Sequence, residues 1–306
     1  MARVRLFKSE RAVTAMLRVF LREIKIEHTL FALPFAYVGA LLAYGGVPPW
    51  EKIAWITVAV LGGRTAAMAA NRLIDARIDA KNPRTASRAL ATGALKPAIM
   101  VWSIAAGLLL LVVAAYELNP LCFALVPLAA GGLIVYPYVK RVSWGVHFFL
   151  GAVDALAPLG AWIAITGRFE VGGWLLFAAV TLWVAGFDIL YALMDRDFDL
   201  REGIASVPAR FGEGSGRALP QVLHLGVVAA LAWLGIVVGA HGWYWAGVAA
   251  AGALLAVESV LVRKGGDVFS LNAAVFNANM IFSVVFLCTT LVSLVTGVSS
   301  HAAFRQ

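Results

Sequence analysis

The stretch Asn71-Arg-Leu-Ile-Asp75-Ala-Arg-Ile-Asp79 places polar side chains four residues apart at the point where a long apolar segment ends. Residues at this spacing share one face of an α-helix, and each lies about one turn from the next. Asn71, Asp75 and Asp79 therefore form a single polar stripe.

A second stretch, Asp188-Ile-Leu-Tyr191-Ala-Leu-Met-Asp195-Arg-Asp197-Phe-Asp199, repeats this arrangement at the end of another apolar segment. Its carboxylates again recur at helical spacing. Two carboxylate pairs at matched positions predict two halves of one metal site.

The composition is that of a membrane protein. The chain has 306 residues, of which 61% are hydrophobic and only 14% are charged, and its mean hydropathy is +0.85. These values are far too apolar for a soluble domain of this length. We therefore predict an all-α integral membrane protein. Its two cysteines, Cys122 and Cys288, lie inside apolar runs and do not indicate a disulfide or metal framework.

Nine apolar segments are long enough to cross a bilayer, which takes roughly 17 to 25 residues. They form one predicted transmembrane domain over residues 28–298, preceded by a basic amphipathic arm at 1–27 and followed by a short tail at 299–306. The predicted segments are 28–46, 53–71, 98–116, 120–139, 145–166, 172–194, 219–240, 243–262 and 269–298.

Positive charges are distributed unequally between the two sides of this predicted bundle. With the N-terminus in the cytoplasm, 21 of the 25 Lys and Arg residues lie in the arm or in cytoplasmic links, and only three lie on the other side. This is the positive-inside pattern, so topology accounts for the net charge of +8. We predict a bacterial inner-membrane protein with both carboxylate stripes facing the cytoplasm, surrounded by lipid, with no nucleic-acid partner and no known protein partner.

The two carboxylate pairs suit Mg²⁺, a hard cation that proteins commonly bind through one or two carboxylates plus substrate phosphates. We predict that Asp75, Asp79, Asp195 and Asp199 hold Mg²⁺ against a diphosphate. The alternative is that these carboxylates are only solvated residues at helix ends. Negative charge is unfavourable at a helix C-terminus, and two equivalent pairs therefore favour a site.

The spacing around both pairs resembles the aspartate-rich motifs of the UbiA superfamily of intramembrane prenyltransferases. The first motif is matched by Asn71-x₃-Asp75-x₃-Asp79 followed by Asn82-Pro-Arg84-Thr-Ala-x-Arg88, and the second by Tyr191-x₃-Asp195-Arg-Asp197-x-Asp199 continuing to Gly203-x₂-Ser206. The resemblance covers essentially the whole chain. It implies nine membrane helices in a UbiA-like bundle, and Mg²⁺-dependent transfer of a polyprenyl group from a polyprenyl diphosphate to an aromatic acid.

One departure from the family's pattern concerns the acceptor. The family's usual first motif has Asp directly after the Asn, whereas this chain has Arg72. With the stretches Lys25-Ile-Glu-His28-Thr-Leu-Phe-Ala-Leu-Pro34-Phe-Ala and Phe187-Asp-Ile-Leu-Tyr191-Ala, this looks most like the 4-hydroxybenzoate-polyprenyltransferase-like branch of futalosine-route menaquinone synthesis. That branch implies 1,4-dihydroxy-6-naphthoate as the acceptor.

Two alternatives stay open. Within the same class, the chain is a 4-hydroxybenzoate polyprenyltransferase of ubiquinone synthesis. In a different class, it is a secondary transporter, because transporters also place acids in membrane helices. The clustering of the acids at one face argues against transport.

Ionisable residues within membrane helices are costly and usually functional. Arg64 shares a helix face with Asp75 and is predicted to bind the carboxylate of the aromatic acid. Asp188 is predicted to orient the acceptor or to pair with Arg64, and Asp154 is a further candidate.

The remaining site predictions follow from the resemblance. The predicted catalytic residues are Asn71, Asp75, Asp79, Asp188, Tyr191, Asp195 and Asp199, and the predicted substrate-binding residues are Arg64, Arg72, Arg84, Arg88, Lys140, Arg141 and Arg210. Arg84, Arg88 and Arg210 are expected in long loops that close over the site. His28 is placed at the mouth of the first segment, where it would touch substrate, and the other histidines, His147 among them, are interpreted as packing or interface residues.

Overall fold

The computed structural model describes residues 14, 16–25, 29–263 and 268–303, and all regular structure within them is helical. The all-α prediction is confirmed. His28 and most of the predicted arm lie outside the described residues. Residues 16–23 form a short helix, and the following helices are α2 (Thr29–Tyr44), α3 (Trp50–Asp79), α4 (Pro97–Leu118), α5 (Pro120–Val139), α6 (Val146–Thr166), α7 (Val171–Glu202), α8 (Val207–Val237), α9 (Trp243–Arg263) and α10 (Val268–Ala303).

Helix length distinguishes α2 from the others. Eight of these described helices, α3 to α10, are long and apolar enough to cross a membrane, whereas α2 has 16 residues. By length alone, the described residues therefore give eight spans in place of the predicted nine.

Three helices extend beyond their predicted limits at the same end of the bundle. α3 continues to Asp79 and α7 to Glu202, whereas their apolar patterns stop near residues 71 and 194. α8 begins at Val207 and not at 219, with a kink at Gly212, where φ is +86°. The apolar pattern marks the lipid-facing length, but α3 and α7 remain helical past it over stretches that contain neither Gly nor Pro. Both carboxylate stripes are consequently on rigid helices and not in loops.

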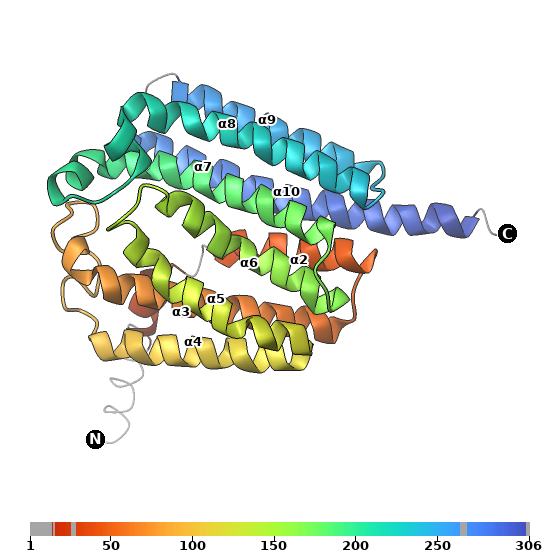
Figure 1. Cartoon of the computed structure of the whole chain (residues 1–306), viewed down its shortest axis with the longest axis horizontal. Helices are drawn as coiled ribbons and strands as arrows, with labels where there is room; N and C mark the ends of the chain where they lie inside the picture. Colours follow the sequence, from red (N-terminus) through yellow and green to blue (C-terminus); the bar gives the residue numbers. More distant parts are fainter. Residues whose placement is uncertain (1–13, 15, 26–28, 264–267, 304–306) are drawn as a thin grey trace.

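The long helices lie side by side, with α8 and α9 at one side of the bundle, α3, α4 and α5 at the other, and α2, α6, α7 and α10 between them (Figure 1). The connections that follow α3 and α7 lie at the same end of the molecule, on the left of Figure 1. The backbone N–H of Ala205, after α7, donates to the carbonyl of Lys140, after α5 (2.7 Å). The fold therefore brings the ends of both stripes to one face.

Aromatic side chains fill the core on the α7 to α10 side. Phe35 of α2 packs against Trp183 of α7 and against Phe282 and Phe286 of α10, with ring centroids 4.9 to 5.9 Å apart. Tyr244 of α9 contacts Phe286 (5.4 Å). This packed cluster fixes α7, and with it the second carboxylate stripe.

Small residues let α3 approach α4 closely. A Cβ added at Gly62 would lie 2.7 Å from the carbonyl oxygen of Gly107, whereas one added at Gly63 would meet only Leu133, at 3.5 Å. Helix pairs in membranes commonly associate through such small residues, which let the backbones come together.

We expect Gly62→Ala to destabilise the protein by about 1–3 kcal/mol, because a backbone atom cannot move aside as a side chain can. The matched control Gly63→Ala should be neutral or slightly stabilising, since alanine favours helix over glycine. Thermal unfolding in detergent measures both. Equal melting temperatures for the two variants would contradict the close α3–α4 contact.

Candidate active site

A cavity of about 940 Å³ runs through the bundle between α3, α5, α6 and α7. On α3 it is lined from Ile56 to Asp79, and on α7 from Trp174 to Asp199. At about 1.5 Å per residue, each of these stretches is more than 30 Å long. The acids of both stripes line one end of the cavity, whereas residues such as Val60 and Phe177 line the apolar remainder.

The first stripe meets a pair of cations at the end of α5. Asp75 is buried, with 1% of its surface exposed, and its Oδ2 accepts from Lys140 Nζ (2.6 Å) and from Asn71 Nδ2 (3.0 Å). The guanidinium of Arg141 lies 3.6 Å from Asp75 Oδ1. One turn further, Asp79 accepts from Arg88 Nη1 (2.6 Å).

The connection after α3 joins the two stripes directly. Asn82 Nδ2 and Arg84 Nε both donate to Asp195 Oδ1, at 2.9 and 2.8 Å, and Arg84 Nη2 donates to the other carboxylate oxygen. The Asn82 side chain also accepts from the backbone N–H of Arg84 (2.9 Å), which fixes the turn. Burial disfavours the charge of Arg84, but the hydrogen bond and charge of Asp195 outweigh it, so the pKa of Arg84 is raised.

The last acid of the second stripe supports the start of α8. Asp199 accepts a hydrogen bond from Ser206 Oγ (2.9 Å). Ser206 Oγ in turn accepts from the backbone N–H of Ala209, so Ser206 caps α8. Asp197, in contrast, points away from the cavity, with its side chain 86% exposed.

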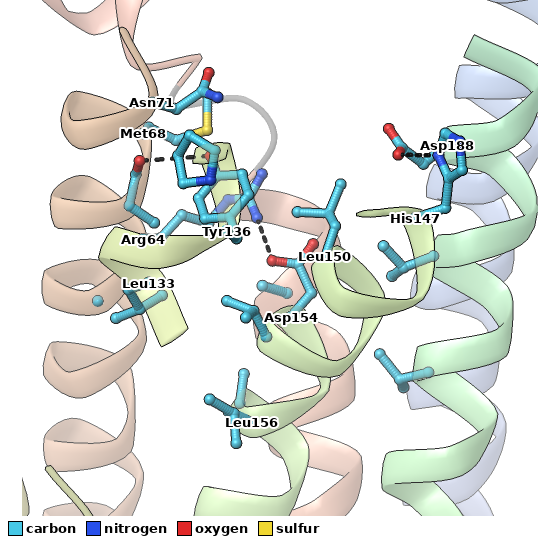
Figure 2. A pocket seen from close by; sticks show the side chains of 18 of the residues that line it. Arg64, Met68, Asn71, Leu133, Tyr136, His147, Leu150, Asp154, Leu156 and Asp188 are labelled. Atoms are coloured by element: carbon cyan, nitrogen blue, oxygen red, sulfur yellow. Dashed lines mark hydrogen bonds and ion pairs between the residues drawn. The ribbon is translucent and has the colours of Figure 1, made fainter. Parts of the chain in front are cut away.

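Deeper in the cavity, Arg64 lies opposite Asp154 of α6 (Figure 2). Its Nη1 is 3.4 Å from Asp154 Oδ1, while its buried Nε donates no hydrogen bond. Arg64 therefore pairs with Asp154 and not with Asp188, and it keeps a free donor.

Asp188 is held by His147, which lies in the first turn of α6 and lines the cavity (Figure 2). Nδ1 of His147 lies 2.7 Å from Asp188 Oδ2, and its Nε2 accepts from the backbone N–H of Val207 (3.2 Å). Because Nε2 accepts, the proton is assigned to Nδ1, which donates to Asp188. His147, interpreted from the sequence as a packing or interface residue, is buried and in addition holds Asp188. The signal available in the sequence was an ionisable residue inside an apolar segment.

The structure brings most, but not all, of the predicted residues to the cavity. Tyr191 lies on the wall beside Phe187, with ring centroids 5.8 Å apart. Arg210 belongs to the first turn of α8 and is exposed outside the cavity, so it is not in a loop over the site. Arg72 reaches the wall, but its donors are directed to Glu23 and Asn71.

The carboxylates do not by themselves form a closed metal site. Among the described residues, no three His, Cys, Asp or Glu side chains gather closely enough to hold an ion. Their oxygens are nonetheless the ligands that Mg²⁺ prefers, and Asp75 Oδ1 is buried without a hydrogen bond. This arrangement fits a site completed by phosphate oxygens of a substrate.

Comparison with known proteins identifies relatives over most of the chain. Residues 32–281 match the UbiA prenyltransferase family. The 4-hydroxybenzoate octaprenyltransferase of Alkalilimnicola ehrlichii is 33% identical over 257 residues, covering 81% of this chain and 84% of that protein. The 4-hydroxybenzoate solanesyltransferase of Synechocystis is 30% identical, over 80% of this chain and 84% of that protein.

Solved structures agree with this match. The apo structure of a UbiA homologue from Aeropyrum pernix is 32% identical and superposes with a TM-score of 0.80, over 87% of this chain and 98% of that one. A homologue from Archaeoglobus fulgidus, solved with GPP and Mg²⁺ bound, is 18% identical with a TM-score of 0.70, over 90% of this chain and 99% of that one. At that identity the likeness concerns the fold.

Proposed function

The chain belongs to the UbiA prenyltransferase family, and on this basis we propose that it transfers a polyprenyl group from a polyprenyl diphosphate to an aromatic acid, with Mg²⁺ as cofactor. The observation that carries the proposal is one cavity with acids and cations at one end, Arg64 and Asp154 deeper inside it, and otherwise mostly apolar walls. Such a cavity suits a substrate with a charged head and a long hydrocarbon tail. Family membership also argues against the transporter alternative.

The cations at the polar end are assigned to the diphosphate. Arg88 and Lys140 form ion pairs with acids of the first stripe, and Arg84 forms one with Asp195 of the second. All three cations are therefore held beside the place where the leaving group accumulates negative charge. Preorganised charges of this kind contribute most to stabilising a developing anion. Bound Mg²⁺, held by Asp75, Asp79, Asp195 and Asp199, would add Lewis-acid neutralisation of the diphosphate.

The reaction breaks the bond between the allylic carbon and the diphosphate oxygen, and the electron pair leaves with the oxygen. A ring carbon of the acceptor then bonds to the allylic cation, and loss of the ring proton restores aromaticity. The apolar wall limits water around the cation. Arg64 is assigned to the acceptor's carboxylate, and Asp188, oriented by His147, to positioning its ring. We place the polar end at the cytoplasmic face of the inner membrane, as the charge distribution predicts.

Two acceptors are candidates. The names of the relatives favour 4-hydroxybenzoate, which was the alternative at the sequence level, over the naphthoate. The observation that favours 1,4-dihydroxy-6-naphthoate is Arg72, at the position where the family's first motif usually has Asp.

The experiment that tests the proposal is prenyl transfer in membranes containing this chain, supplied with a polyprenyl diphosphate and Mg²⁺. The two acceptors are run side by side, each with an EDTA control. We expect metal-dependent product from 4-hydroxybenzoate. Product from the naphthoate alone would reassign the acceptor and keep the class, and no product from either in a folded protein would overturn the proposal.

A further inference from the structure

Arg72 occupies a buried position beside the first stripe, with 4% of its surface exposed. As the neighbour of Asn71 it lies about 100° around the helix from the stripe. Its Nε donates to the backbone carbonyl of Glu23 (3.0 Å), and its Nη1 donates to Asn71 Oδ1 (2.8 Å). One guanidinium therefore bridges the segment before α2 and the first residue of the stripe.

Glu23 extends this bridge to the connection after α3. It is also buried, at 6% exposed, and its Oε2 accepts from the backbone N–H of Ala89 (2.8 Å). Its Oε1 lies 4.0 Å from Arg72 Nε. Ala89 follows Arg88, the partner of Asp79. Removing one partner of a buried ion pair strongly destabilises the structure around it, because the other charge stays buried without a counter-charge.

Asn71 transmits the effect of Arg72 to the acid that is central to the site. Because its Oδ1 accepts from Arg72, its Nδ2 is the atom that faces Asp75, to which it donates (3.0 Å). Without the guanidinium, Asn71 Oδ1 would lose its donor, and the amide would be held only by its hydrogen bond to Asp75. The chain of contacts thus runs from Glu23 through Arg72 and Asn71 to Asp75.

We propose that Arg72 is a positioning residue that holds the side chains of Asn71 and Asp75 in the orientation needed for catalysis. Residues 16–25 then belong to the active-site structure, because Glu23 anchors them to Arg72. Lys25, two residues after Glu23, lines the cavity. The catalytic half of this inference rests on the proposed function. In this chain, the position after Asn71 thus carries an anchor for the N-terminal segment and not a metal ligand.

The first test is Arg72→Met, compared with Arg77→Met on the exposed side of the same helix. We expect Arg72→Met to lower kcat by about 10–100-fold, the usual effect of losing a contact that orients a ligand, with the KM for the aromatic acid unchanged. Arg77→Met should match the wild type. Arg72→Lys should stay close to Arg72→Met, because an ammonium cannot reproduce the planar fork that reaches two acceptors. Wild-type turnover in Arg72→Lys would overturn the positioning role.

The second test needs no substrate, so it separates this inference from the proposed function. Limited trypsin digestion in detergent, read by mass spectrometry at the exposed Arg18, reports how firmly residues 16–25 are held, because neither substitution alters the Arg18–Val19 bond. We expect about tenfold faster cleavage in Arg72→Met and in Glu23→Ala, since each loses a charged hydrogen-bonding group. The double variant should be no faster than Arg72→Met alone, because the two residues act through one contact. Unchanged cleavage, or fully additive effects, would overturn the anchor, even if prenyl transfer proceeds as proposed.

Discussion

Asp195→Asn should reduce prenyl transfer by about 10²–10³-fold, the range seen when one preorganised charged or polar group is removed from a transition-state site. Asp195 is the acid that binds both Asn82 and Arg84, so the change also weakens the hold on the connection after α3. The protein should still fold, because the side chain faces the polar end of the cavity and not the packed core. Initial rates at saturating concentrations of both substrates, normalised to folded protein, measure the effect.

Asp197→Asn is the matched control for this prediction. It changes the same residue type two positions further along α7, but its side chain is 86% exposed and its contact is with Arg196 (3.4 Å). We expect activity within about twofold of the wild type, as is usual for exposed surface positions. Comparable losses in both variants would show that charge on α7, and not the cavity position of Asp195, controls the rate, and would contradict the site assignment.

Much of the fold follows from the sequence because hydropathy is a strong signal in membranes. Backbone groups in lipid must be satisfied within the helix, so an apolar run of sufficient length has one stable conformation. The predicted limits of α5, 120–139, coincide with those of the structure. Where the chain leaves lipid this constraint ends, and hydropathy could not show that α3 and α7 continue for two further turns.

The candidate site was predictable to the extent that helical spacing fixes neighbours. The stripe of Asn71, Asp75 and Asp79 is an i, i+4 relation within one helix, and the structure places these residues as expected. Contacts between helices carry no such local signal. The pairing of Arg64 with Asp154, and of Asp188 with His147, depends on how α6 is rotated against α3 and α7. That rotation is set by packing throughout the bundle.

The Arg72 contact illustrates the same limit. Its substitution for the usual Asp is visible in the sequence, but its partner Glu23 lies 49 positions earlier in the chain. No periodicity links the two positions. A buried charge in this region predicts that some partner exists, and only the fold identifies it.

Arg64→Ala should raise the KM for the aromatic acid by about 10–100-fold, as expected for the loss of a charged hydrogen bond, while the KM for the polyprenyl diphosphate stays within about twofold. Arg64 has a buried, unpaired Nε available to a ligand. The change also leaves Asp154 without its cation, and an unpaired carboxylate repels an anionic acceptor. Both effects act on the acceptor alone.

Asp154→Asn separates these two contributions. It removes the competing carboxylate and leaves the Arg64 guanidinium to the acceptor, so the KM for the aromatic acid should fall or stay unchanged. The double variant Arg64→Ala/Asp154→Asn should recover the part of the loss that came from repulsion and retain the part that came from the missing guanidinium, because contacting residues are not additive. If Arg64→Ala raised both KM values equally, Arg64 would belong to the general packing of the cavity. If the double variant had the wild-type KM for the aromatic acid, the whole effect of Arg64→Ala would come from the unpaired carboxylate of Asp154.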